Sequence, residues 1–274
     1  YHLPGVWKSA TLIPLMGDPS LLQRLQHESH VWFTVPECIQ DRARLRGFLA
    51  MLAEDETRRH NRFQFSEDRH RFLISHALVR QVLSRYCELT PEEWHFSRSE
   101  HGKPEICNPG APRLRFNLTH TVGLAACVVN LSGECGIDAE QITGRHNPLG
   151  VARRMFSQAE YLHQRRLTGQ AQLDYFFQRW TLREAYVKAR GIGIRFPTRK
   201  LLFHVDADDR ISVEFEPEID DCDENWQLQL LRPTERHVAA APLIGRRTSA
   251  RHCRLSRRRH VITNRHDIDV QPGP

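Results

Sequence analysis

The sequence predicts an α+β fold made of two similar halves, each combining helices with a sheet. Segments with helical spacing of apolar residues precede segments of strand-like composition, and this order of helices then strands is expected twice. The halves are predicted at residues 1–132 and 133–241. A faint internal repeat agrees with this division, because an arginine, an aromatic residue, a serine and an acid recur near the beginnings of RFQFSEDRHRFLISHALVRQVL and RMFSQAEYLH.

The first half is predicted to begin with helices. Apolar residues recur on one face of residues 41–53, and Ser66 is expected to cap a helix that continues through residues 71–86. A short helix is predicted after Thr90, because a proline stands at the first helical position and Glu93 completes a capping box.

Strands are predicted to follow at residues 114–118 and 124–131, where apolar and β-branched residues are enriched. Ser132 and Gly133 favour a turn, so we expect the second strand to form a hairpin with the CGIDAE segment that comes next.

The second half is predicted to contain a helix that starts at Ser157 and another within residues 176–193. Two glycines, Gly191 and Gly193, are expected to end the latter helix. Short strands are then predicted at LLFHV, ISVEF and WQLQLL, because acidic turn residues separate these segments.

Composition excludes several classes of protein. No apolar run approaches the roughly 18 residues that a membrane span needs. The seven cysteines are scattered without a C-x-x-C pair, so neither a disulfide framework nor a zinc site is indicated. No secretion signal is recognised at Tyr1, although the chain does not begin with Met, and a cytoplasmic location is expected.

The net charge of +6 comes from the C-terminal segment. Residues 242–274 contain eight arginines and two aspartates, whereas the rest of the chain is balanced. We expect this segment to be a disordered basic tail. A nucleic-acid-binding function through the tail remains an alternative, although the balanced charge elsewhere argues against nucleic acid as a partner.

Four residues in two motifs point to phosphate chemistry. In GIDAE, Asp138 and Glu140 are two apart, which places both carboxylates on the same face of a strand. In WTLREAYVKA, Glu184 and Lys188 are four apart and share a helix face. Each pair alone is equally typical of an ordinary surface. Together, three carboxylates suit Mg²⁺, which completes its shell with water and substrate phosphates.

Basic residues elsewhere could hold such a phosphate. Lys103 lies between a glycine and a proline in HGKPEI, where its ammonium group can act as a fixed charge. His120 lies in FNLTHT. Further candidates form an arginine cluster that could equally be a solvated helix face: Arg58, Arg59, Arg62, Arg69 and Arg71.

The ordered set HGKPEI, FNLTHT, GIDAE, MFSQAEY and WTLREAYVKARGIG resembles the signature series of the 4′-phosphopantetheinyl transferases, specifically the longer surfactin-synthetase-activating (Sfp) type. The resemblance covers roughly residues 40 to 235. It implies a pseudo-dimer of two similar α/β halves with coenzyme A bound between them. It also implies a Mg²⁺-dependent transfer of phosphopantetheine from coenzyme A to a serine of an apo acyl, peptidyl or aryl carrier protein, by a monomer, with release of adenosine 3′,5′-bisphosphate.

The resemblance also assigns roles to residues. It implies that Asp138, Glu140 and Glu184 hold Mg²⁺, that Glu184 takes the serine proton, and that Lys188 neutralises the bridging phosphate oxygens. The residues that it implies bind coenzyme A are Arg59, Arg71, Lys103, Pro104, Thr119 and His120.

Three positions leave alternatives open. Glu160 matches a family acid, but Ser157 and Glu160 also form a complete capping box, so a structural role is an equal alternative. Arg183 stands where the family usually has lysine, and Phe72 replaces a small polar residue, so direct ligand contacts at these positions are in doubt.

A Mg²⁺-dependent phosphohydrolase that uses the same acids is a further alternative function. The sequence does not distinguish among fatty-acid, polyketide, nonribosomal-peptide and lysine-pathway carriers, each of which presents a serine at the start of a helix.

Overall fold

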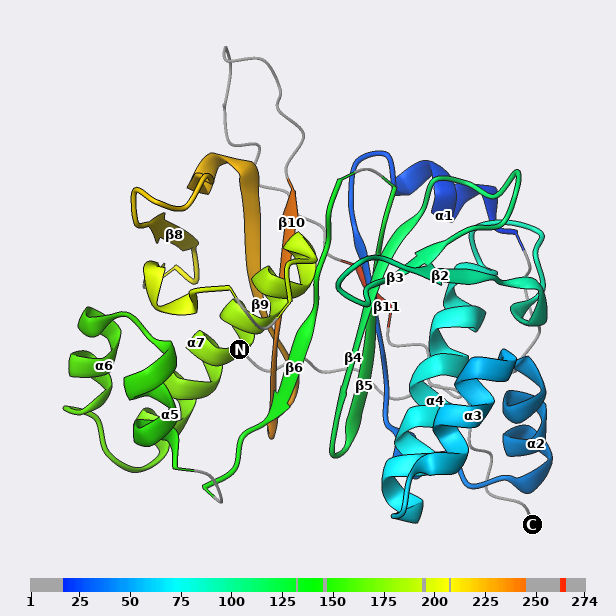
Figure 1. The fold of residues 1–274 in the computed structure, drawn as a ribbon, viewed down its shortest axis with the longest axis horizontal. Helices are drawn as coiled ribbons and strands as arrows, with labels where there is room; N and C mark the ends of the chain where they lie inside the picture. The colour runs from blue at the N-terminus through cyan, green and yellow to red at the C-terminus, as the bar shows by residue number, and fades with distance from the viewer. Residues whose placement is uncertain are drawn as a thin grey trace.

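A computed structural model describes residues 17–131, 133–144, 147–193, 196–206, 208–244 and 262–264. Within them, helices and strands form two halves that lie side by side, with strands of both halves at the junction (Figure 1). None of the described helices is both long enough and apolar enough to cross a membrane.

The first half contains four α-helices, two short 3₁₀ helices and five strands within the described residues. In chain order these are α1 (Pro19–Arg24), β1 (His30–Thr34), η1 (Pro36–Cys38), α2 (Arg42–Met51), α3 (Glu54–Arg62), α4 (Ser66–Leu83), η2 (Pro91–Glu93), β2 (Phe96–Arg98), β3 (Pro104–Ile106), β4 (Arg115–Thr121) and β5 (Leu124–Asn130).

The second half begins with a strand and continues through helices to further strands. Its elements are β6 (Asp138–Gln141), α5 (Pro148–Met155), α6 (Gln158–Gln164), α7 (Gly169–Arg190), η3 (Thr198–Lys200), β7 (Leu201–Val205), β8 (Ile211–Phe215), η4 (Asp223–Asn225), β9 (Trp226–Thr234) and β10 (His237–Ile244). A last described strand, β11 (Ile262–Asn264), pairs in parallel with β1.

The two halves repeat one topology. In the first, β1 pairs with β5 and β5 with β4, all antiparallel; in the second, β6 pairs with β10 and β10 with β9 in the same sense. Each half also carries a small two-stranded sheet, β2–β3 or β7–β8. The long helices α4 and α7 pack on the two main sheets. The internal repeat that the sequence suggests is therefore present as a repeated strand–helices–strands order.

Each half has its own apolar core, and a further core joins them. Leu78, Val82 and Trp94 belong to the first core, and Leu182, Tyr186 and Trp226 to the second. The junction is filled by apolar residues of the two sheets, among them Val31, Val128, Ile137 and Ala241.

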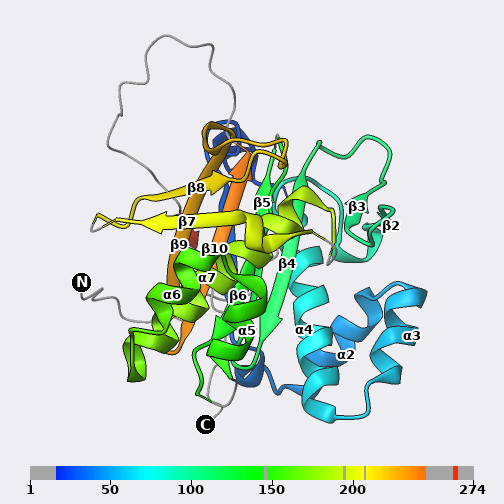
Figure 2. The same cartoon turned by 60° about the vertical axis from the view of Figure 1, so that its left-hand side comes forward.

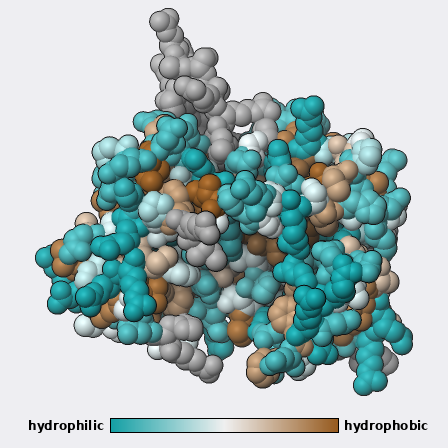
Figure 3. Space-filling view, viewed as in Figure 1, coloured by the Kyte–Doolittle hydropathy of each residue, from teal (hydrophilic) through white to brown (hydrophobic). Residues whose placement is uncertain are grey.

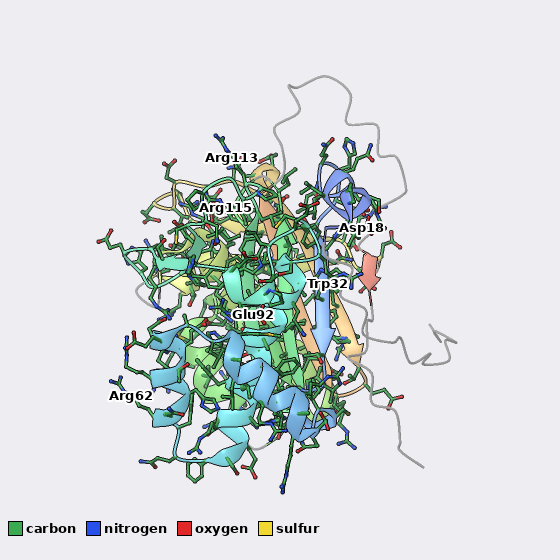
Figure 4. The ribbon with its side chains drawn as sticks, turned by 90° about the vertical axis from the view of Figure 1, so that its right-hand side faces the viewer. Asp18, Trp32, Arg62, Glu92, Arg113 and Arg115 are labelled. Atoms are coloured by element: carbon green, nitrogen blue, oxygen red, sulfur yellow. The ribbon has the colours of Figure 1, made fainter. Side chains whose placement is uncertain are left out.

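Hydrophilic side chains cover most of the outer face shown in Figure 3. Figure 4 shows the helices of the first half in front of the strand that carries Trp32.

Hydrogen bonds also join the halves. The Ile137 amide donates to Asn117 Oδ1 at 2.9 Å, and His237 Nε2 lies 2.7 Å from the Val122 carbonyl oxygen. Because these bonds run between β4 or its following turn and the second sheet, they fix β4 and β6 next to each other, between the helices of the two halves (Figure 2).

Several local predictions are confirmed. The Ser157 side chain caps α6, and the Thr90 amide donates to Glu93 Oε2 at 2.7 Å at the start of η2. Gly191 ends α7 in the left-handed conformation, with φ of 63°. The long helix starts at Gly169, seven residues before the predicted segment.

Other predictions are wrong. β5 does not form a hairpin with β6: β5 pairs with β4 and β1, whereas β6 pairs with β10 in the other sheet. Each half does not run simply from helices to strands, because β1 follows α1 and precedes the other helices of the first half, and β6 precedes the helices of the second. Ser66 is the first residue of α4 rather than its cap, which is Phe65.

The predicted disordered tail lies mostly outside the described residues. Where it is described, the prediction is wrong, since β10 extends to Ile244 and residues 262–264 form β11.

Candidate active site

A close approach of two backbones brings the acidic motifs together. Gly136 lies two residues before the start of β6, and a Cβ atom placed on it would lie 2.1 Å from the Ala185 carbonyl oxygen and 2.6 Å from the Ala189 amide nitrogen of α7. Only glycine fits here. The chain entering β6 therefore lies against α7 at the residues that directly follow Glu184 and Lys188.

Asp138 lies at the centre of the acidic group. Its side chain is buried, and Oδ1 accepts a hydrogen bond from Lys188 Nζ at 2.6 Å. The same ammonium group lies 3.3 Å from Thr119 Oγ1 and 3.3 Å from the Ile137 carbonyl oxygen. Asp138 Oδ2 is buried without a hydrogen-bond partner among the described residues. Since a buried carboxylate oxygen ordinarily has a partner, this atom is open to a bound ligand.

Glu140 lies on the same strand face as Asp138, as the spacing predicts. Trp180 Nε1 donates to Glu140 Oε1 at 3.3 Å, and Thr121 Oγ1 lies 3.5 Å from Oε2. Burial, and then the negative charge of Asp138, raise the pKa of Glu140 to about 7. The two carboxylates therefore repel each other.

Glu184 contributes a third carboxylate from α7. It is half-buried, and burial followed by the charge of Asp138 raises its pKa above the ordinary value. No hydrogen-bond partner for its side chain is found in the described part of the chain. Asp138 is therefore close enough to both glutamates to disfavour their charged forms.

The donor set fits a hard divalent cation. Carboxylate oxygens are the ligands that Mg²⁺ prefers, and a cation would relieve the repulsion among the three acids and satisfy Asp138 Oδ2. A closed cluster is not preformed: no group of three or more His, Cys, Asp or Glu side chains within the described residues is arranged to hold a metal. Lys188 instead neutralises Asp138.

A pocket of about 270 Å³ lies in the first half, on the other side of β4 from the acids. Three predicted ligand-binding residues line it, Arg59, Pro104 and His120. Thr119 is adjacent to His120 on β4 but faces Asp138. Because β4 and β6 are edge strands that face each other, the pocket and the acids adjoin along one edge.

His120 links the pocket to the acidic group. The surrounding protein atoms, and then the positive charges of His76, Arg71 and Lys188, lower the pKa of the His120 imidazole. The His120 side chain is exposed, so solvent weakens the effect of burial on its pKa and the neighbouring positive charges contribute more. Arg71 and Lys188 therefore place positive charge near this imidazole, on this part of β4.

The other two predicted binders do not line the pocket. Arg71 pairs with Asp68 on its own helix. Lys103 Nζ donates to Glu134 Oε2 at 2.7 Å and to the Ala189 carbonyl oxygen at 2.9 Å. Lys103 thus connects the first half to the end of α7.

The structure favours the structural interpretation of Glu160. This side chain is buried and accepts hydrogen bonds from Ser157, from Arg183 and from the Phe203 amide at 3.2 Å. Arg183 is itself buried in the same network and points away from Asp138's surroundings toward β7. Both residues hold α6, α7 and β7 together.

Three polar residues near the site were missed from the sequence. Thr121 contacts Glu140, whereas Glu56 and His76 line the pocket. Thr121 could have been found, because it is two residues after Thr119 on a strand and therefore shares its face. Glu56 and His76 lie in different helices, and no local pattern predicts their contact.

Comparisons with known proteins identify the relatives of this chain. A family model described as 4′-phosphopantetheinyl transferase superfamily matches residues 134–242, and one described as 4′-phosphopantetheinyl transferase, N-terminal, matches residues 40–131. The transferase HetI of Nostoc sp. is 36% identical over 180 residues, which cover 65% of this chain and 75% of that protein. The transferase Sfp of Bacillus subtilis is 32% identical over 167 residues, 61% of this chain and 72% of that protein.

Among solved structures, the holo-[acyl-carrier-protein] synthase of Thermotoga maritima is similar with a TM-score of 0.34 and 18% identity, over 42% of this chain and 64% of that one. The sequence matches define the class: this protein is an enzyme, a phosphopantetheinyl transferase with an α+β fold. The chain belongs to the 4′-phosphopantetheinyl transferase family and is of the Sfp type.

Proposed function

We propose that this enzyme transfers the 4′-phosphopantetheine arm of coenzyme A to a serine of an apo acyl or peptidyl carrier protein. The reaction requires Mg²⁺ and releases adenosine 3′,5′-bisphosphate. The observation that supports this most is the meeting of Asp138, Glu140, Glu184 and Lys188 beside a basic pocket, at the junction of the two halves.

The reaction is a displacement at phosphorus. The serine Oγ forms a bond to the phosphorus that carries the pantetheine arm, and the bond from this phosphorus to the bridging pyrophosphate oxygen breaks. The bridging oxygen leaves with the electron pair as part of adenosine 3′,5′-bisphosphate. Glu184 accepts the serine proton, and beside a cation it acts by holding the serine hydroxyl close rather than by strong basicity.

Asp138, Glu140 and Glu184 would hold Mg²⁺. When bound, the ion supplies positive charge where the pyrophosphate oxygens become more negative. Lys188 lies against Asp138 and can turn its ammonium group to these oxygens once a cation satisfies the carboxylate. Trp180 and Thr121 orient Glu140 from both of its oxygens.

The pocket receives the nucleotide end of coenzyme A. Arg59 lines it and supplies positive charge, His120 offers an imidazole for hydrogen bonding, and Pro104 contributes to its wall. Thr119, beside Lys188, lies between this pocket and the acids. Arg71 and Lys103 would bind phosphate only after exchanging their present partners, Asp68 and Glu134.

One chain holds both the pocket and the acids, so we further propose that a monomer is the active form. We also propose that it acts in the cytoplasm, on carrier proteins of fatty-acid, polyketide or nonribosomal-peptide biosynthesis. Light scattering on the active protein would contradict the first proposal if it gave a dimer mass that dilution does not change.

Incubation with coenzyme A, Mg²⁺ and a panel of apo carrier proteins tests the proposal. We expect each accepted carrier to gain the mass of one phosphopantetheine arm, and adenosine 3′,5′-bisphosphate to appear in equal amount. Glu184→Gln should reduce the rate by at least about 10²-fold, because loss of a positioned base typically costs 10²- to 10⁴-fold. Glu92→Gln, which alters an exposed glutamate in η2, should retain full rate. Hydrolysis of coenzyme A without any carrier gaining mass would instead support a phosphohydrolase.

A further inference from the structure

A carboxylate–histidine pair stands in the wall of the pocket. His76 Nδ1 lies 2.7 Å from Glu56 Oε1, and both residues line the cavity. The other oxygen of Glu56 accepts from Arg80 at 2.6 Å and from the Ala53 amide at 2.9 Å. Glu56 is thus fixed by three donors while only 7% of its side chain is exposed.

Glu56 stays ionised at neutral pH. Burial alone would raise the pKa of its carboxyl, but the hydrogen bond and charge of His76, the Ala53 amide and Arg80 outweigh burial and lower the pKa to about 2. An ionised carboxylate can only accept a hydrogen bond, so Nδ1 of His76 must carry a proton. The hydrogen bond to Glu56 therefore occupies Nδ1 of His76 and leaves Nε2 to face the pocket.

The imidazole of His76 is held in one orientation. Its ring stacks on Phe72 with centroids 4.0 Å apart, and the Arg59 guanidinium lies 5.3 Å from the centre of the same phenyl ring. Phe72 therefore aligns both basic side chains along one wall. The remaining nitrogen, Nε2, has no hydrogen-bond partner among the residues that the structure describes.

Both acidic side chains that line the pocket have basic partners, whereas some of its basic groups have no acidic partner among the described residues. Glu56 binds His76 and Arg80, and Asp55 lies 3.7 Å from Arg98. Arg59, His76 Nε2 and His120 have no acidic partner left over within the described residues, and Arg59 keeps its charge unpaired. The pocket thus carries an excess of positive charge that an anion would satisfy.

We propose that His76, oriented by Glu56, binds a phosphate group of the ligand in its doubly protonated form, in which Nδ1 donates to Glu56 and Nε2 donates to a phosphate oxygen. This inference rests on the proposed function, because it takes coenzyme A as the ligand. His76 touches the substrate at a distance from the reacting phosphorus and does not take part in the chemical step. Arg59 and His120 provide the other basic groups around the same phosphate.

Two substitutions separate binding from structural support. In His76→Asn, the amide nitrogen replaces Nδ1, so the bond to Glu56 is kept and Nε2 is lost. In His76→Gln, the longer side chain places its amide near Nε2 and gives up the bond to Glu56. His70→Asn is the matched control, because His70 is on the same helix but bonds to the Pro36 carbonyl oxygen outside the pocket.

Calorimetric titration of the full chain with coenzyme A gives the readout. We expect His76→Asn to weaken binding about 10- to 100-fold, the usual effect of losing one hydrogen bond to a charged group. His76→Gln should bind more tightly than His76→Asn, and His70→Asn should match the unaltered protein. A purely structural role for His76 predicts the reverse order of the two His76 variants, and that result would overturn the inference.

Parallel titrations with 3′-dephospho-coenzyme A and adenosine 3′,5′-bisphosphate identify the phosphate. If the effect of His76→Asn disappears with the dephospho form, His76 binds the 3′-phosphate; if it persists, His76 binds the pyrophosphate. Either result supports a phosphate contact. Equal binding of all three ligands by His76→Asn and the unaltered protein refutes it.

The outcome also distinguishes this inference from the proposed function. An unaltered protein that transfers the arm while His76→Asn binds normally leaves the function standing and removes only the contact. If the unaltered protein binds none of the three ligands, both fail.

Nitrogen NMR of ¹⁵N-histidine in the unaltered protein gives a measurement that needs no folded variant at position 76. The Nε2 signal of His76 should move on addition of coenzyme A and that of His70 should not, and an unmoved His76 signal would contradict the contact.

Discussion

Lys188 binds Asp138 and not Glu184, the acid one turn before it on α7. A surface pair of this spacing is worth only a few tenths of a kcal/mol, so the buried carboxylate of Asp138 on β6 is the stronger partner for the ammonium group. Glu184 has no ion-pair partner among the described residues. Burial, and then the negative charge of Asp138, raise its pKa. The arrangement keeps one acid neutralised by the protein and two acids available to a metal ion.

Lys188→Met would test this division of charge. The substitution leaves Asp138 buried beside two glutamates without its ammonium partner, so we expect the apo protein to lose about 3 kcal/mol of stability. Mg²⁺ should restore part of the loss by binding the three acids. Urea unfolding with and without Mg²⁺ measures both effects, and a variant as stable as the unaltered protein would contradict the importance of the pair.

Glu160 should prove to be a structural residue. Glu160→Gln removes the charge that buried Arg183 faces, and breaking a buried pair in this way costs about 3 to 5 kcal/mol. Urea unfolding should show this loss, while transfer activity per folded molecule should change little. A stable but inactive variant would instead restore Glu160 as a functional acid.

Acid should destabilise the protein through Glu56. The pKa of this carboxyl is about 2 in the folded chain against an ordinary value of 4.5, so ionised Glu56 stabilises the fold above about pH 4.5. This stability is lost as the pH falls from 4.5 toward 2. Unfolding free energies measured across this range should fall less steeply for Glu56→Gln, which has no proton to bind. Parallel slopes for the two proteins would disprove the assignment.

Elements with a local cause were predictable, and those with a distant cause were not. The helices α2 and α6 and the 3₁₀ helix η2 follow from apolar spacing and from caps within a few residues, and the strands β7, β8 and β9 are bounded by acidic turns. The partner of β6 was not predictable, because its sequence does not distinguish pairing with β5, the strand just before it, from pairing with a later strand. Its true pairing with β10 depends on residues about 100 positions away.

The acidic site, too, could be predicted from the sequence only where its cause is local. The spacing of Asp138 and Glu140 predicts their shared strand face, but not that Gly136 lets β6 approach α7 so closely. Nor does it predict that Lys103, apparently a free loop lysine, extends to the carbonyl end of α7. Both contacts join segments far apart in the sequence.

Gly136→Ala tests the approach of β6 to α7. The added Cβ would meet the Ala185 carbonyl oxygen at 2.1 Å, so one element must move. We expect a loss of stability of about 1 to 3 kcal/mol and a larger fractional loss of transfer activity, because Asp138 moves with the strand. Gly144→Ala is the matched control, since nothing lies within 4 Å of its Cβ position. Equal behaviour of the two variants would show that the contact is not needed.

At the scale of the whole molecule, the repeated topology places two non-equivalent edge strands, β4 and β6, next to each other. The edge β4 of the first half carries His120 toward the pocket, and the edge β6 of the second carries the acids. The shared apolar core and the bonds from Asn117 and His237 hold these edges side by side. A ligand that spans both edges therefore adds a connection between the halves.

Ligand binding should consequently stabilise the two halves together. Coenzyme A at about 100 times its dissociation constant should add about 2.7 kcal/mol to the free energy of unfolding, which raises the melting temperature by roughly 5 to 10 °C for a chain of this size. Mg²⁺ added with coenzyme A should raise it further. In Asp138→Asn, coenzyme A alone should still stabilise the protein through the pocket, but the Mg²⁺ increment should vanish. Scanning calorimetry of both proteins would reject a shared site if the increment survived the substitution, because the acids would then not be where the metal and the pyrophosphate meet.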